Sequence, residues 1–435
     1  MSSRVEEFLD FVRRSPTAFH AAENIRVELA ARGFEELREQ EPWRIQPGGK
    51  YVITRNRSSV IALIVPERGM AHFQIVASHG DSPTFKLKPV AEDVVCGKYV
   101  RLNTEGYGGM IMSSWLDRPL SIAGRVMVRE TRGVSTRLVN LDGAAVLIPS
   151  MPIHFNREVN DGCKFNAQID MLPLYGDGSA QGGLLRALGE HCGVAPEAIV
   201  GSDLFLYNRD RGAVWGAKGE YFSCPRIDDL ECAWTSLQAF EQAQNPDQID
   251  VLAVFDNEEV GSGTKQGADS TFLTDVLSRV AAALGATEAE FRAALASSFM
   301  ISADNAHAVH PNHPEKYDAG NRVYMNEGVV LKHNANQKYT TDGVSAAIFR
   351  MLCESAGVPV QDFANRSDVR GGSTLGNIAN THASMNTADI GLPQLAMHSA
   401  CETAGVLDLD SMISAMGAFY ATAIRMQSDG AYLLG

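Results

Sequence analysis

The chain has 435 residues, of which 45% are hydrophobic and 21% are charged, and this composition gives no sign of a fibrous or disordered protein. One hydrophobic core rarely serves so long a chain, so two domains are expected. The formal net charge of −14 argues against a general affinity for nucleic acid or for anionic membranes, and an acidic small substrate would need a local cation where it binds.

The lack of a recognisable secretory signal and the pattern of cysteines predict a cytoplasmic protein. The N-terminal segment has no unbroken apolar stretch and no small-residue cleavage site, so we expect no secretory signal. No run of residues approaches the roughly 18 to 20 apolar positions that span a bilayer. The seven cysteines are scattered and form no CxxC pair, which is typical of free thiols in a reducing compartment.

The first 90 residues alternate between helical and β patterns. Apolar positions spaced three and four residues apart predict amphipathic helices over 4–14 and 18–32. Runs rich in β-branched residues follow at 51–54, 60–65 and 73–77, and the last run leads into a polar turn. Open α/β sheets bind their ligands at such turns.

From 91 to 224 the pattern changes, which predicts a mostly β insertion. Short β-branched stretches such as 121–128 and 144–148 alternate with glycine-rich turns, and one helix is predicted near 182–188. After 225 the α/β alternation returns, with helices predicted over 228–243, 270–284, 341–356 and 410–426 and strands over 249–255, 299–302 and 328–331, followed by a short apolar run at 394–397. We therefore predict an α/β fold in which residues 1–90 and 225–435 form a mixed sheet flanked by helices, interrupted by the insertion.

Histidine and acidic residues gather where the predicted strands end. Four apolar runs lead into such residues, namely His79 with Asp81, Glu258 with Glu259, Asp304, and His398. A fifth group, Arg-Ile-Asp-Asp at 226–229, precedes a predicted helix. Each feature is weak alone, but five at the same end of successive elements are hard to produce by chance.

Co-catalytic metal chemistry explains these residue types. Two divalent ions about 3.5–4 Å apart need one bridging carboxylate and further nitrogen or oxygen ligands, and zinc accepts two histidines with three carboxylates. A carboxylate that binds no metal must take the proton from the attacking water, and the adjacent Glu258 and Glu259 suit a division of these tasks. Asp81, two residues after His79, can orient that imidazole, so we group it with the catalytic residues.

The motifs HGDSP, RIDD, DNEEVGS, SADNAHAVHPN and QLAMHS, in this order, resemble those of the aspartyl aminopeptidases of bacterial type, a family of co-catalytic zinc exopeptidases. The resemblance spans nearly the whole chain. It implies a metalloaminopeptidase that removes N-terminal residues, preferentially Asp or Glu, from small peptides with a free N-terminus. It also implies two zinc ions per subunit, which Mn²⁺ or Co²⁺ could replace.

The resemblance also assigns residues. It implies one zinc on His79, Asp228 and Asp304, and the other on Asp228, Glu259 and His398, with Glu258 as general acid/base. The substrate contacts that it implies are His307, Lys332 and Tyr339, together with His154, which would reach the active site of a neighbouring subunit. The insertion at 91–224 would serve dimerisation, and the dimers would assemble into a dodecamer.

Other functions compete with this one. The same scaffold could carry a broad-specificity or leucine-preferring aminopeptidase, or a dinuclear hydrolase for another amide or ester. An assembled shell that binds peptides without turnover is a non-enzymatic alternative, but a pure binder has no use for the base Glu258. The chain contains no HExxH and no GxSxG, so a mononuclear helical zincin is excluded and a serine hydrolase has no support. His307, His310 and His313 form a three-spaced series that two prolines interrupt, which favours a packed loop over a further metal site.

Overall fold

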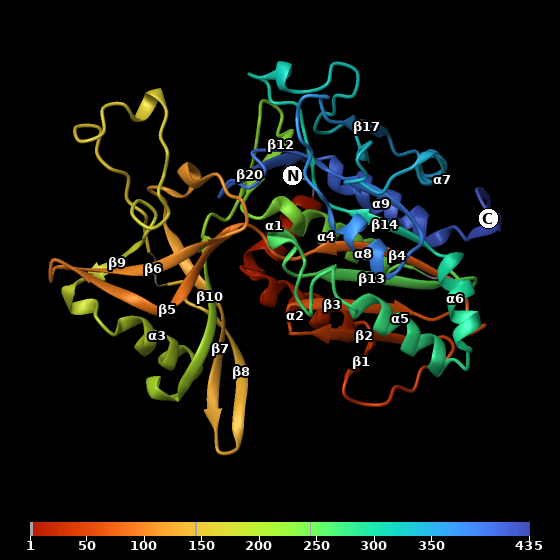
Figure 1. The fold of residues 1–435 in the computed structure, drawn as a ribbon, viewed down its shortest axis with the longest axis horizontal. Helices are drawn as coiled ribbons and strands as arrows, with labels where there is room; N and C mark the ends of the chain where they lie inside the picture. The colour runs from red at the N-terminus through yellow and green to blue at the C-terminus, as the bar shows by residue number, and fades with distance from the viewer. Residues whose placement is uncertain (1–2, 144–145, 244) are drawn as a thin grey trace.

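A nine-stranded mixed sheet forms the centre of the larger part of the molecule (Figure 1). The computed structural model describes residues 3–143, 146–243 and 245–435. In spatial order the strands are β1 (Glu35–Leu37), β2 (Lys50–Arg55), β3 (Ser59–Ile64), β13 (Ile249–Phe255), β4 (Phe73–His79), β14 (Phe299–Ala303), β18 (Asn386–Gly391), β16 (Val329–His333) and β17 (Val360–Ala364).

The strands at the middle of this sheet run parallel and end at one edge. β4 pairs in parallel with β13 on one side and with β14 on the other, and β14 pairs in parallel with β18. Every residue of β4, β13 and β14 is buried, as expected for strands covered on both faces. The side chains that follow these three strands therefore lie near one another.

Helices cover both faces of the nine-stranded sheet. One face packs against α1 (Ser3–Arg14), α2 (Ala18–Ala31), α4 (Ile227–Phe240), α7 (Gly343–Ala356) and α9 (Asp408–Ala421). The other face packs against α5 (Phe272–Ala283), α6 (Glu288–Ala296) and α8 (Leu375–His382). This arrangement confirms the predicted α/β fold with a mixed sheet between helices.

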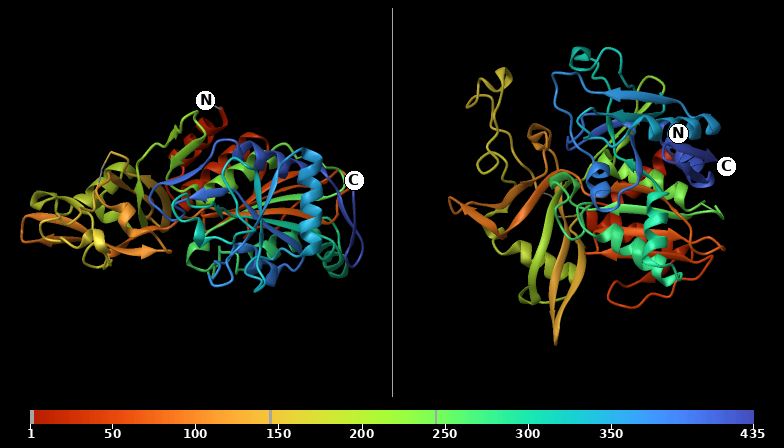
Figure 2. Two further views of the ribbon diagram at one scale, coloured as in Figure 1. Left: turned by 90° about the horizontal axis from the view of Figure 1, so that it is seen from above. Right: turned by 45° about the vertical axis from the view of Figure 1, so that its right-hand side comes forward.

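A separate six-stranded sheet forms the other end of the molecule, beside the nine-stranded sheet (Figure 1). Its strands in spatial order are β8 (Gly133–Asn140), β7 (Leu120–Glu130), β10 (Ile199–Asn208), β5 (Thr84–Val95), β6 (Tyr99–Tyr107) and β9 (Leu174–Asp177). Helix α3 (Gly183–Cys192) packs on this sheet, and the two share a core of their own. Residues 150–163, in the middle of the long loop between β8 and β9, are mostly exposed and stand away from the rest of the chain, whereas Ile148 and Met171 of the same loop are buried (Figure 2).

Smaller elements complete the fold. A five-stranded sheet has the order β11 (Ala213–Trp215), β12 (Tyr221–Cys224), β20 (Glu402–Gly405), β19 (Pro393–Leu395) and β15 (Ala306–His307), and β21 (Ile424–Ser428) pairs with β22 (Ala431–Leu434). Short 3-10 helices are η1 (Met112–Trp115), η2 (Val159–Asp161), η3 (Gly178–Ala180), η4 (Pro196–Ala198), η5 (Glu258–Val260) and η6 (Pro314–Lys316). No helix among the described residues is long and apolar enough to cross a membrane.

Two predictions made from the sequence are wrong in detail. The apolar run at 394–397 forms β19 of the five-stranded sheet, so only three of the four expected strand ends belong to the nine-stranded sheet. The last helix ends at Ala421 rather than near 426, because the backbone of Ala423 pairs with Gly435 and the amide of Ile424 donates to the Gln74 side chain. Residues 144 and 145 of the predicted strand 144–148 lie outside the described residues.

Candidate metal centre and substrate pocket

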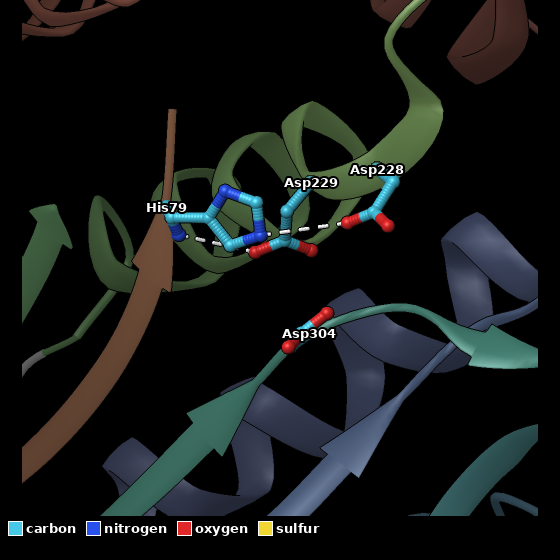
Figure 3. A group of neighbouring side chains, drawn as sticks. All are labelled: His79, Asp228, Asp229 and Asp304. Atoms are coloured by element: carbon cyan, nitrogen blue, oxygen red, sulfur yellow. Dashed lines mark hydrogen bonds and ion pairs between the residues drawn. The ribbon is translucent and has the colours of Figure 1, made fainter. Parts of the chain in front are cut away.

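Five side chains predicted to bind metal meet at one edge of the nine-stranded sheet. His79 is the last residue of β4, Asp304 follows β14, and Glu259 follows β13 within η5. Asp228 lies in the first turn of α4, whose backbone is not helical at this residue. Figure 3 shows His79, Asp228, Asp229 and Asp304 facing one another from β4, α4 and β14.

Asp228 lies between the two histidines. Its Oδ1 atom is 3.4 Å from Nε2 of His79, and its Oδ2 atom is 3.4 Å from Nε2 of His398. The same His398 nitrogen is 3.4 Å from Oε2 of Glu259. Asp228 is therefore common to two groups whose donor atoms lie within 4.8 Å of one another, His79 with Asp228, Asp229 and Asp304, and Asp228 with Glu259 and His398.

The donor set fits divalent metal ions. Buried carboxylate oxygens of Asp228, Asp229 and Glu259 have no hydrogen-bond partner in the described part of the chain. Burial and neighbouring negative charges hold the pKa values of Asp229 and Glu259 well above their usual range. Such a concentration of buried acceptors is unfavourable without positive charge, and zinc binds this combination of imidazole nitrogen and carboxylate oxygen. A third, overlapping group joins His79 to Glu258 and Glu259.

The pKa values of Glu258 and Asp228 are shifted in opposite directions. Burial raises the pKa of Glu258 to about 8, and the Asp304 carboxylate raises it further while His79 opposes the shift. Burial also acts to raise the pKa of Asp228, but contacts with His398 and His79 outweigh it and lower that pKa. The two imidazoles therefore favour the charged form of Asp228, whereas the pKa of Glu258 lies near neutrality, as a general acid/base requires.

Asp81 has more contacts than its predicted role requires. Nδ1 of His79 lies 3.1 Å from the backbone carbonyl of Asp81 and 3.4 Å from its Oδ1 atom, so both groups of Asp81 face that imidazole. The Asp81 carboxylate also accepts hydrogen bonds from the backbone amides of Glu258 and Glu259, at 3.1 and 3.2 Å, and from the hydroxyl of Tyr107 at 2.7 Å. One carboxylate thus holds the turn that carries both glutamates.

Two partners of His398 were missed by the sequence interpretation. Glu402 accepts a hydrogen bond from the backbone amide of His398 at 2.7 Å and another from the amide of Asp228 at 3.1 Å. The carbonyl of Gly109, which follows β6 of the six-stranded sheet, lies 2.6 Å from Nδ1 of His398. The sequence interpretation also missed Asp229, whose carboxylate accepts a hydrogen bond from the backbone amide of His79 at 3.1 Å. Of the missed residues, only Asp229 could have been found from the sequence, because it adjoins Asp228.

Strained backbone surrounds the centre. Arg226, Asn257 and His398 have φ values of 60°, 63° and 66°, which place non-glycine residues in the left-handed region. Each of them is a candidate ligand or lies within two residues of one. Strain of this kind persists only where the surrounding structure enforces it, and it concentrates at functional sites.

Of the predicted substrate residues, Lys332 lies beside Asp304, and Tyr339 and His307 lie near it around the ring of Phe363. Nζ of the buried Lys332 donates to the carbonyl of Asn305 at 2.8 Å, lies 3.9 Å from Oδ1 of Asp304, and sits 5.4 Å from the ring centroid of Tyr339. Burial, assisted by Lys332, lowers the pKa of His307 to about 4, so this imidazole is neutral. Burial raises the pKa of Tyr339, so its phenol stays protonated.

His154 lies elsewhere. It is exposed in the long loop between β8 and β9, and no contact among the described residues joins it to the candidate metal centre. Neighbours on this loop expose large apolar side chains, with Phe155 82% and Ile169 69% exposed. The role implied for His154 therefore stays a prediction.

A buried cluster of nitrogen and oxygen donors at a sheet edge, with a carboxylate of raised pKa beside it, defines a metal-dependent hydrolase. Comparison with known proteins identifies its family. Residues 11–420 match the family described as aminopeptidase I zinc metalloprotease (M18). The chain belongs to this M18 family and is a zinc-dependent aminopeptidase, which confirms the resemblance read from the motifs.

Individual relatives are similar over almost their whole length. A protein of Clostridium acetobutylicum named probable M18 family aminopeptidase 2 is 46% identical, covering 93% of this chain and 95% of that one. A structure titled as the complex of Ape4 and Nbr1 superposes with a TM-score of 0.93 at 35% identity, covering 96% of this chain and 85% of that one. A chain from the structure of the S. cerevisiae mApe1 dodecamer superposes with a TM-score of 0.84 at 26% identity, covering 95% of each chain.

Proposed function

We propose that this aminopeptidase binds two zinc ions per subunit. One would be held by His79, Asp228 and Asp304, and the other by Asp228, Glu259 and His398. The observation that carries this proposal is the position of Asp228, whose two carboxylate oxygens each lie 3.4 Å from the Nε2 atom of a different histidine. A carboxylate that faces two separate donor groups is suited to bridge two ions.

The mechanism that we propose assigns proton transfer to Glu258. Zinc held by these residues would make water a better nucleophile and would polarise the carbonyl of the scissile bond. Glu258 accepts the proton of the attacking water and passes it to the leaving amine, for which its pKa of about 8 is well placed. Asp81 orients the His79 imidazole and fixes the turn of the two glutamates through their backbone amides.

We further propose that the enzyme prefers N-terminal Asp or Glu. Lys332 is a buried cation with three donors, of which one goes to the Asn305 carbonyl at 2.8 Å. A substrate carboxylate can accept from the remaining donors, with the protonated Tyr339 and the neutral His307 beside them. Without this cation, the carboxylates of the centre would repel an acidic side chain.

Metal analysis and a panel of aminoacyl substrates test these proposals. Purified protein should carry close to two zinc ions per chain, and it should hydrolyse Asp and Glu substrates faster than Leu or Ala substrates. Lys332→Met should lower kcat/KM for acidic substrates by about ten- to a hundredfold, because a charge-assisted hydrogen bond contributes about 1.5–3 kcal/mol. The exposed neighbour Lys338→Met is the matched control. If Lys332→Met kept the selectivity of the wild-type enzyme, the proposal of an acidic preference based on Lys332 would be wrong. The assignment of the protein as an aminopeptidase would stand.

We also propose that the insertion, residues 91–224, makes dimers that assemble into a dodecamer and that His154 acts in the neighbouring subunit. The apolar side chains exposed on its loop support an interface there, because exposed patches of this kind mark contact surfaces. The superposition on the mApe1 dodecamer supports the assembly. Mixed oligomers of inactive His154→Ala and Glu258→Gln subunits should regain activity, and mixed oligomers that stay inactive would contradict action in trans.

The cytoplasm is the location that we propose. All seven cysteines are free, and Cys224, Cys232 and Cys353 are buried. Free thiols persist in a reducing compartment. Fractionation of cells that produce the protein should recover it with cytoplasmic markers.

A further inference from the structure

The loop of residues 334–342, between β16 and α7, carries Tyr339, one of the predicted substrate contacts. Residues 335–338 just before it are exposed, whereas Tyr339 is buried. The Tyr339 ring lies 5.4 Å from Nζ of Lys332, and its centroid is 6.4 Å from that of Phe363. Its hydroxyl forms no hydrogen bond with any described residue. Groups other than the phenol must therefore hold this part of the loop in place.

One residue of β18, Asp389, anchors this loop. Its Oδ2 atom accepts hydrogen bonds from the backbone amide of Thr340 and from the Oγ1 atom of Thr340, the latter at 2.6 Å. Oγ1 of Thr341 accepts from the backbone amide of Asp389 at 2.8 Å and donates to its carbonyl at 3.3 Å. In the part of the chain that the structure describes, the other hydrogen bonds of the loop are internal to it or cap α7. Asp389 thus provides the hydrogen bonds that tie the loop to the sheet.

The position of Asp389 is fixed by the sheet itself. Asp389 is fully buried, and its strand pairs with β14 on one side and with β16 on the other. In the antiparallel pairing with β16, Ile390 lies opposite Leu331. Asp389 precedes Ile390 and Lys332 follows Leu331, so the two charged residues are neighbours across this strand pair. The same pair of strands therefore supplies Lys332 directly and determines where Tyr339 lies.

A substrate contact on a loop depends on what fixes the loop. Exposed segments with few contacts open easily, whereas binding groups must be held close to their productive geometry. We propose that Asp389 is a positioning residue for substrate binding, which holds Tyr339 in place beside Lys332 by anchoring the loop 334–342. This inference rests on the proposed function, because it takes Tyr339 as a substrate contact.

Two threonines on the same carboxylate provide a matched pair of variants. Thr340, in the loop, donates through Oγ1 to Oδ2 of Asp389 at 2.6 Å, and Thr374, the residue before α8, donates through Oγ1 to Oδ1 at 2.7 Å. Thr340→Val and Thr374→Val each remove one of these hydrogen bonds with little change of shape. Only the first variant loosens the loop that carries Tyr339, so a purely structural role of Asp389 would not distinguish them.

Steady-state kinetics of the zinc-loaded enzyme test the proposal, with the aminoacyl substrate that the wild-type enzyme cleaves fastest. Thr340→Val should raise KM by about three- to tenfold, in the range for the loss of one hydrogen bond to a charged group. Its kcat should change by less than about twofold, because binding rather than proton transfer is weakened. Thr374→Val should keep the wild-type KM and show only a lower melting temperature. A wild-type KM in Thr340→Val, or an equal rise in both variants, would overturn the proposal.

A double-mutant cycle with Tyr339→Phe shows whether the anchor acts through the phenol. Tyr339→Phe should raise KM, and adding Thr340→Val to it should raise KM by less than about twofold more, because the anchored hydroxyl is already absent. Independent effects that multiply in the double variant would overturn the proposal. If Tyr339→Phe alone kept the wild-type KM, the substrate role of Tyr339 would be wrong and the inference would fall with it. A raised KM in Tyr339→Phe with a wild-type KM in Thr340→Val would remove the inference alone.

Replacement of Asp389 itself provides a further test. Asp389→Ala should raise KM more than Thr340→Val does, because it also removes the acceptor of the Thr340 amide. Asp389→Asn keeps one acceptor oxygen and should recover most of that loss. An Asp389→Asn enzyme with a KM as high as that of Asp389→Ala would contradict the proposal. If Asp389→Ala does not fold, the threonine pair and the double-mutant cycle still decide.

Discussion

The two halves of the candidate metal centre are built by different parts of the fold. His79 is the last residue of a central strand, and its side chain is 1% exposed. His398 lies in a loop after β19 of the five-stranded sheet, has a φ of 66°, and exposes 32% of its side chain. The nine-stranded sheet positions the first half, whereas separate contacts with Glu402 and Gly109 position the second. One centre thus combines a rigid part with a part that depends on its neighbours.

The two glutamates of η5 give the largest expected effect, because the proposed mechanism gives them different functions within one turn. Glu258→Gln should lower kcat by roughly 10²–10⁴-fold while both metals are retained, since proton transfer by a positioned group contributes that much. Glu259→Gln should instead release metal from the half around His398. Turnover measured with metal content by mass spectrometry separates the two variants. Identical behaviour of both would contradict the assigned roles.

Removal of each histidine compares the two halves directly. In metal-free protein, His79→Ala should lower the free energy of unfolding by about 3–5 kcal/mol, because it leaves buried carboxylates without their cation. His398→Ala should lower it by less, because His398 faces the same buried carboxylates but is 32% exposed, so solvent screens part of its interaction with them. Urea unfolding in the presence of a chelator measures both. Equal losses of stability would show that the two histidines contribute equally to the fold, in spite of their different burial.

Replacing Gly108 by alanine, which adds one methyl group, should give the smallest effect. That effect should be confined to metal binding in the half of the centre around His398. A Cβ atom there would lie 3.1 Å from Cβ of Glu259 and 3.4 Å from Cβ of Pro83, at a φ of +74°. Gly108→Ala should weaken zinc retention by about tenfold, in the range of changes to groups that support metal ligands. Gly133→Ala carries a similar backbone penalty, at a φ of +106° with no atom within 4 Å of the added Cβ, and should retain zinc normally. Equal zinc retention by both variants would contradict the steric explanation.

The sequence predicts the rigid half of the centre better than the other half. The apolar runs of β4, β13 and β14 end at the polar residues that the pattern singled out, because parallel strands bring their carboxyl ends to one edge. His398 was singled out too, but its element was assigned to the wrong sheet.

The residues that hold His398 in place cannot be recognised from the sequence around them. Gly109 is 289 residues from His398 along the chain, and its contact is made by a backbone carbonyl, which any residue type could supply. Glu402 looks like an ordinary charged residue in the sequence, and the pairing of β20 with β12 and β19 places it against two candidate ligands, Asp228 and His398. Contacts of this kind follow from the assembly of the sheets, so they could not be predicted from periodicity or spacing.

The carbonyl of Gly109 has a consequence for protein engineering. It reaches His398 from the end of β6, a strand of the six-stranded sheet, at 2.6 Å. That sheet is therefore no detachable module, and a minimal enzyme made by excising it would lose a support of its own histidine. A chimaera that takes the insertion from a relative would have to transplant the turn after β6 unchanged in conformation. Exchange between relatives is thus constrained at this turn, although the turn supplies no candidate metal ligand.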